Sequence, residues 1–142
     1  MNTQQEEARE YLLQVKDMKK KTRRLSAEIR SIRESAMSIE SPLLTEDRVQ
    51  TSHGMDPPCI RKTDRMIDME SRLIEEYRRL QAVQSDIAAR INSMDVSQER
   101  TVLRFRYLSG WNWDDIANAL GVSLRTAHRI HEAALLHFPT SS

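Results

Sequence analysis

Proline and glycine are distributed very unevenly along this chain of 142 residues. Residues 1–41 and 59–109 contain neither of them, whereas residues 42–58 hold three of the four prolines and one of the three glycines. Because both residues interrupt regular structure, two long uninterrupted helices joined by a loop are predicted. The other two glycines, Gly110 and Gly121, lie in the last third of the chain, where they predict short helices separated by sharp turns.

The composition favours helices and excludes several classes of protein. Charged residues make up 30% of the chain and aromatic residues 5%, with a mean hydropathy of −0.63. This profile does not suit a β-sandwich or barrel, which needs frequent turns. The 22 basic and 21 acidic residues leave a net charge of +1. That balance excludes a histone-like polybasic protein, but it permits nucleic-acid binding through a locally basic surface.

Both long segments carry a heptad of mainly apolar residues, which is typical of a coiled coil or helical hairpin. The first seam consists of Tyr11, Val15, Met18, Thr22, Leu25, Ile29, Ile32, Ala36 and Ile39. The second consists of Met66, Glu70, Leu73, Tyr77, Leu80, Gln84, Ile87, Ile91 and Met94, and Ile60, Ile67 and Ile74 widen its apolar stripe. The two helices, predicted at about residues 4–38 and 59–93, either fold back antiparallel across the loop of residues 39–58 or pair with another copy.

Several other classes of protein find no support in the sequence. No segment has the roughly 18 consecutive apolar residues of a membrane span, and the N-terminus lacks the apolar core of a signal peptide. The single cysteine, Cys59, cannot form an internal disulfide. His131 and His137 are six residues apart, whereas a zinc protease motif needs two histidines four apart. We therefore expect a cytoplasmic protein that is not an enzyme and has no metal, cofactor or small-molecule substrate.

From residue 95 onward the pattern changes to three short helices. The second of these, WDDIANAL, follows Asn112, and the third, LRTAHRIHEAALLHF, follows Ser123; both residues are good helix N-caps. Gly121 can adopt the left-handed conformation between the two helices, and the small Ala117 and Ala127 allow a close crossing. Two helices joined by such a turn form a helix-turn-helix.

The stretch TVLRFRYLSGWNWDDIANALGVSLRTAHRIHEAAL resembles the region-four helix-turn-helix of sigma factors and their phage-encoded relatives. The matching pieces are VLRFRYLSG, WDDIA, GVS, TAHRI and the closing HEAAL. The upstream layout, with VQTS at residues 49–52 before a Glu/Arg-rich helix, is similar to that of the ArpU/RinA-like phage late-transcription regulators. These resemblances imply a sequence-specific DNA-binding transcription regulator of phage or prophage origin, active in a bacterial cell.

The resemblance implies that a recognition helix at residues 123–138 enters the major groove. The candidate DNA-contacting residues of its first turns are Ser123, Leu124, Arg125, Thr126, His128, Arg129 and Glu132. Arg125 and Arg129 are four residues apart and share a face, and arginine suits bidentate contact to guanine. The alternative for both is an ordinary solvated helix surface. Arg104 and Asn112 are candidates for holding phosphates.

Three neighbouring residues receive other roles. Arg106 is predicted to form an ion pair with Asp115 between the first two short helices, and Trp113 is predicted to pack. Trp111 either lies exposed beside the DNA-facing turn or packs on the first short helix. Farther upstream, KKKTRR at residues 19–24 places five cations in six positions. This cluster is either a solvated helix surface or a patch that contacts phosphates.

The expected division of labour places oligomerisation or partner binding in residues 1–94 and DNA binding in residues 95–142. A three-helix unit of about 45 residues is marginally stable and reads one half-site, so a homo-oligomer, with a dimer favoured, is expected. Double-stranded DNA is the expected partner, and RNA polymerase is a further candidate. Two alternatives stay open: a phage DNA-packaging or structural adaptor with a helix-turn-helix, and a polymerase-binding protein without DNA contact.

Overall fold

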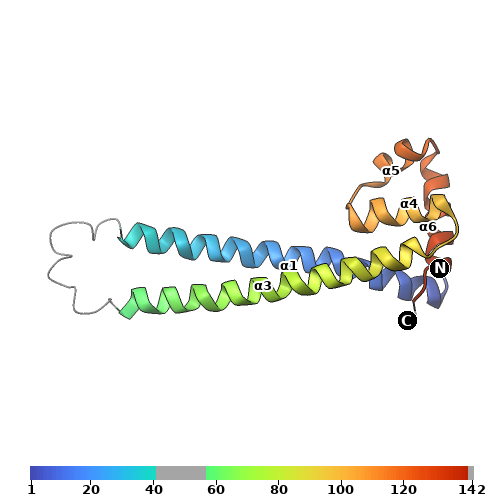
Figure 1. Ribbon diagram of the computed structural model, residues 1–142. Helices are drawn as coiled ribbons and strands as arrows, with labels where there is room; N and C mark the ends of the chain where they lie inside the picture. Colours follow the sequence, from blue (N-terminus) through green and yellow to red (C-terminus); the bar gives the residue numbers. More distant parts are fainter. Residues whose placement is uncertain (41–56, 141–142) are drawn as a thin grey trace. The chain divides into compact units, whose positions relative to one another are not determined.

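The computed structural model describes residues 1–40 and 57–140, which consist of helices and their connections (Figure 1). The elements are α1 (Thr3–Glu40), α3 (Pro57–Asn92), α4 (Ser97–Leu103), η2 (Arg104–Leu108), α5 (Trp113–Leu120) and α6 (Leu124–His137). The short π-helix η2 directly continues α4. No strand occurs in the described residues, so the predicted all-α class, with long helices followed by a helix-turn-helix, is confirmed.

Several sequence-based predictions lie outside the described residues. The VQTS stretch at residues 49–52 and the loop predicted at residues 39–58, apart from its ends, belong to this part of the chain. The side chains of four residues with predicted roles are not described either: Ala36, Ile39, Cys59 and Ile60.

The chain divides into two compact units whose borders cut across the long helices. Unit 1 comprises Met1–Lys19 and Arg79–Ser142, and unit 2 comprises Lys20–Arg78. The border expected between residues 94 and 95 therefore differs from the border between compact units. The N-terminal part of α1 and the C-terminal part of α3 belong to the same unit as the C-terminal helices. The functional division at residue 94 stays a prediction.

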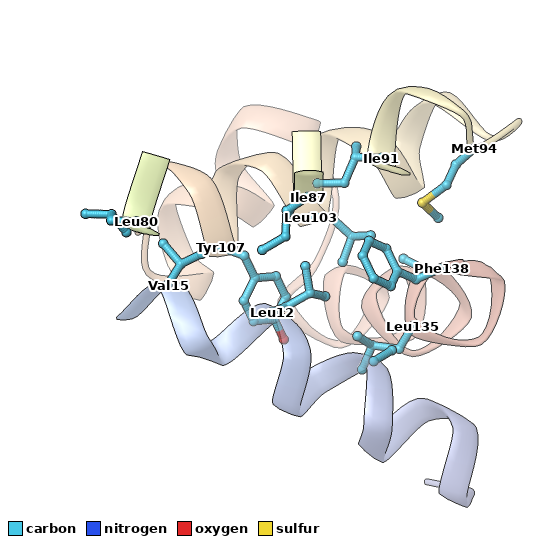
Figure 2. Packing of buried hydrophobic residues seen from close by; sticks show 12 residues of the cluster. Leu12, Val15, Leu80, Ile87, Ile91, Met94, Leu103, Tyr107, Leu135 and Phe138 are labelled. Carbon is cyan, nitrogen blue, oxygen red and sulfur yellow. The ribbon is translucent and has the colours of Figure 1, made fainter. Parts of the chain in front are cut away.

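Unit 1 is built around a core to which α1, α3 and the C-terminal helices all contribute (Figure 2). Its buried members are Ala8, Leu12, Val15, Leu80, Ile87, Ile91, Met94, Leu103, Tyr107, Ala134, Leu135 and Phe138. Fully burying a large aliphatic side chain contributes about 1.5–3 kcal/mol. Three short helices alone offer few such side chains, and the ends of the two long helices supply the others.

Polar contacts also fasten the long helices to the end of α6. The Gln4 side-chain amide donates to the carbonyl oxygen of Leu136 at 3.1 Å. The guanidinium of Arg90 donates to the carbonyl oxygen of Pro139 at 2.8 Å. The last carbonyls of a helix have no partner within it, so Gln4 satisfies one of the acceptors that α6 leaves free.

Within unit 2, α1 and α3 run antiparallel. Lys21 pairs with Glu76 at 3.1 Å, and Arg33, farther along α1, pairs with Glu70, which lies earlier on α3, also at 3.1 Å. An antiparallel hairpin is one of the two arrangements that the heptads allow. None of the described helices has the length and apolar character that crossing a membrane requires.

The seam of α3 in unit 2 differs from the heptad prediction. Tyr77 was expected in the seam and is 51% exposed, while Ile67 and Ile74, expected beside it, are 54% and 52% exposed. Met69 and Glu76 are buried instead. A strict seven-residue repeat drifts by about 20° per heptad on a straight helix, so apolar positions leave the face that the neighbouring helix covers.

Candidate nucleic-acid interface

The helix α5 is fixed at both ends by local hydrogen bonds. The side-chain oxygen of Asn112 accepts from the backbone nitrogen of Asp115 at 2.8 Å, which confirms Asn112 as the N-cap. At the other end Gly121 adopts φ +66° and ψ +34°, the left-handed conformation. The backbone nitrogen of Val122 donates to the carbonyl oxygen of Ala117 at 3.0 Å. This C-terminal bond and the left-handed glycine form the Schellman turn that glycine favours.

Ser123 is the N-cap of the next helix, α6. Its hydroxyl oxygen accepts from the backbone nitrogen of Thr126 at 3.2 Å and donates to the Thr126 hydroxyl at 3.0 Å. Ala117 and Ala127 are buried where α5 and α6 pack together. The turn, both caps and the close crossing therefore form as the sequence predicts.

An aromatic cluster supports α6 from behind. The ring of Trp113 lies 4.4 Å from that of His128 and 4.7 Å from that of His131, measured between centroids. The guanidinium carbon of Arg106 lies 5.0 Å from the Trp113 centroid, and its nitrogen donates to the carbonyl oxygen of Trp111 at 3.0 Å. Trp113 thus packs against side chains of both η2 and α6.

The expected partner of Arg106 is wrong. No ion pair joins Arg106 to Asp115 in the part of the chain that the structure describes. Asp115 instead lies in the first turn of α5, where a carboxylate is stabilised by the positive end of the helix dipole. Arg106 is held by the Trp113 ring and by a backbone carbonyl, so its role is structural through different contacts.

His131 is the buried polar residue of this cluster. A hydrogen bond of 2.6 Å joins its Nε2 atom and the Tyr107 hydroxyl. Burial lowers the pKa of His131 to about 4, and the charges of His128, Arg9 and Arg106 act in the same direction. The imidazole is therefore neutral at physiological pH. Burial also raises the pKa of Tyr107, so its hydroxyl keeps its proton.

Sequence reasoning missed the role of His131. The signal was its spacing, because it lies four residues after Ala127 and four before Leu135, both of which are buried. No three histidine, cysteine or acidic side chains gather into a metal site among the described residues.

The opposite side of α6 is open to solvent. Arg125, Arg129 and Glu132 follow one another at spacings of four and three residues and share this face. All three side chains are exposed, as are those of Leu124 and His128. The predicted recognition helix thus presents a charged face to solvent, while its opposite side packs against the rest of unit 1.

A comparison with protein families adds to this geometry. Residues 97–137 match the family model described as Sigma-70, region 4. The C-terminal helices form a sigma-70 region 4-like helix-turn-helix. Such a unit is a DNA-binding domain, and the match spans α4, η2, α5 and α6. No curated protein and no solved structure matches the chain.

Four of the predicted DNA-contacting residues of the region 4-like unit have partners within the protein. Ser123 and Thr126 are bonded to each other, and Asn112 caps α5. The Arg104 guanidinium donates to the side-chain oxygen of Asn92. For these residues, as for the other candidates, DNA contact stays a prediction.

Trp111 combines the two arrangements considered for it. Its ring stacks on Phe105 with centroids 4.2 Å apart and an interplanar angle of 11°. Its backbone nitrogen donates to the carbonyl oxygen of Phe105 at 2.8 Å. Even so, 38% of the residue is exposed beside the N-terminal end of α5.

The KKKTRR cluster does not act as a single patch. The Lys19 ammonium donates to the carbonyl oxygen of Leu108 at 3.1 Å, and Lys21 pairs with Glu76. Lys20, Arg23 and Arg24 are exposed. Lys19 and Lys21 thus make contacts within the protein. A phosphate contact by the three exposed residues stays a prediction.

Proposed function

We propose that the chain is a sequence-specific DNA-binding transcription regulator of phage or prophage origin that acts in the bacterial cytoplasm. One observation carries this proposal: the exposed face of α6, with Arg125 and Arg129, belongs to a region 4-like helix-turn-helix whose turn and caps are fully formed. The similarity to ArpU/RinA-like late-transcription regulators supports the phage origin. The protein works by binding, without catalysis or a cofactor.

The chemistry of the exposed face suits the reading of base edges. Arg125 and Arg129 lie about 6 Å apart along the helix axis, which lets their guanidinium groups reach neighbouring base pairs. Each can donate two hydrogen bonds to guanine, and Glu132 can accept from cytosine. Leu124 offers an apolar surface to a thymine methyl group. Ser123, at the positive end of α6, lies where a phosphate is favoured.

The proposal is tested by the capture of genome fragments at about 150 mM salt. The intact chain is compared with the Arg125→Ala/Arg129→Ala variant and with a control, Arg65→Ala/Arg72→Ala, which removes the same charge from exposed positions of α3. The intact chain and the control should enrich one discrete fragment that the first variant loses. Each recognition-helix arginine should contribute about 1–3 kcal/mol of specific binding. No enrichment by the intact chain, or equal enrichment by the first variant, would overturn the proposal.

RNA polymerase is the second candidate partner. Residues 95–142 carry five basic and five acidic residues. Such a neutral domain is better suited to binding a protein surface than a strongly basic domain is. Phosphate contacts make affinity fall steeply with salt, by a factor that grows with each contact. Copurification with polymerase that persists from low to high salt, without DNA enrichment, would favour this alternative.

A further inference from the structure

Unit 2 exposes an apolar strip on α3, formed by Ile67, Ile74 and Tyr77. Each side chain is more than half exposed. Ile67 and Ile74 are seven residues apart, so they lie on one face of the helix two turns apart, and Tyr77 follows three residues later on the adjoining face. Large apolar side chains that recur on one helix face mark an interaction surface more often than scattered ones do.

The helix α1 does not cover this strip, because it occupies a different face of α3. On that face Met69 and Glu76 are buried, and Glu76 is paired with Lys21 of α1. The Arg33–Glu70 ion pair, at 3.1 Å, joins α1 to α3 at the border between the face that contacts α1 and the strip. A partner for the strip must therefore come from outside the described hairpin.

The strip is complementary to a second copy of itself in an antiparallel arrangement. A two-fold axis between Glu70 and Ser71 would place Ile67 of each copy opposite Ile74 of the other, because both lie about 5 Å from that point along the helix. The exposed Asp64 and Arg78 lie at opposite ends of the same face. The antiparallel arrangement brings Asp64 of each copy near Arg78 of the other, whereas a parallel arrangement would bring like charges together.

We propose that unit 2 is a dimerisation surface on which the α3 helices of two copies pack antiparallel, strip against strip. The contact is short, like those of weak and transient complexes, so the dimer is measured at high protein concentration. A dimer carries two helix-turn-helix units, which is what a two-fold symmetric operator requires. The proposal concerns the chain without DNA, so it stands or falls independently of sequence-specific binding.

Light scattering on the full chain at about 100 µM, without DNA, measures the oligomeric state. The intact protein should have twice the chain mass of 16.5 kDa. Ile67→Lys/Ile74→Lys should have the single mass and unchanged helical circular dichroism, because both positions are exposed. Val96, which is 46% exposed and outside the strip, gives the control Val96→Lys, which should remain dimeric. A monomeric intact chain, a ring of eight or more copies, or a dimeric lysine variant would overturn the proposal.

Disulfide trapping tests the orientation. In a Cys59→Ser background, Ile67→Cys chains and Ile74→Cys chains are oxidised separately and as an equal mixture. The antiparallel arrangement predicts cross-linking in the mixture alone, since like positions lie about 10 Å apart along the axis and a disulfide needs closely spaced residues. Cross-linking within each separate sample would indicate a parallel pair and overturn the proposed arrangement, as would no cross-linking at all.

Discussion

The two compact units differ in how completely they bury their apolar side chains. Unit 1 encloses aliphatic and aromatic residues from five helices around Leu12, Ile87 and Leu135. In the described part of unit 2, two of the four buried residues, Thr22 and Glu76, are polar, and larger apolar side chains face solvent. A unit that must present α6 in one orientation needs a specific core. The apolar side chains that unit 2 exposes are those that the proposed dimer would cover.

The largest expected effect comes from a core residue that lies far in sequence from the predicted recognition helix but packs in the same core. Leu12→Ala should lower the free energy of unfolding of unit 1 by about 2–5 kcal/mol, the usual range for a buried leucine. Trp111 and Trp113 are the only tryptophans and both lie in unit 1, so urea unfolding followed by tryptophan fluorescence reports on this unit. An unchanged fluorescence transition would show that α1 does not stabilise the helix-turn-helix.

Acid should affect unit 1 through His131. The pKa of His131 is about 4 in the folded chain and 6.5 in the unfolded chain. Between these values the unfolded chain binds a proton that the folded chain does not, so stability falls as the pH falls from 6.5 to 4, on the order of 2 kcal/mol in all. Fluorescence-monitored unfolding across this range should show the loss in the intact chain and in a His128→Gln control. In His131→Gln this part of the pH dependence should disappear; its persistence would contradict the assignment.

A smaller effect is expected at the turn before α6. Gly121→Ala should cost about 1–2 kcal/mol, because an L-residue is strained at φ +66°. A Cβ atom added there would meet no atom within 4 Å, so the cost comes from the backbone alone. Gly121→Asn should cost less, since asparagine tolerates this conformation better. The same unfolding assay compares the two variants, and an alanine variant as stable as the intact chain would refute the left-handed turn.

The smallest effect is expected in unit 2. Arg33→Gln removes the exposed ion pair with Glu70 and should change stability by less than about 1 kcal/mol. Unfolding followed by circular dichroism, which reports on all helices, provides the measurement. A loss greater than that of Gly121→Ala would mean that unit 2 depends on its ion pairs and would reverse the comparison between the units.

Features specified by neighbouring residues could be predicted from the sequence. The caps at Asn112 and Ser123 and the turn at Gly121 follow from local backbone chemistry, and all three form as predicted. In unit 1 the predicted seam positions Val15, Ile87 and Ile91 are buried, whereas the fully buried Leu12 was not placed in the seam. In unit 1 the C-terminal helices pack on α1 and α3 and help to bury most of the apolar stripe of each.

Features that depend on distant residues could not be predicted in the same way. The burial of His131 requires Tyr107 and Trp113 to be in place, and a histidine three residues from another does not indicate this. The contacts of Arg106 depend on how the chain passes through the π-helix η2. The exposure of Ile67 reflects which face α1 covers, and the apolar pattern alone does not specify that choice.

The composition of unit 1 from two separated segments has a consequence for biosynthesis. Residues 1–19 leave the ribosome early, yet their packing partners around Leu135 and Phe138 are translated more than a hundred residues later. Chains are synthesised at about 5–20 residues per second, so the first helix spends several seconds without its core. The helices α1 and α3 are translated before α6. The proposed dimerisation through α3 can therefore precede the folding of unit 1.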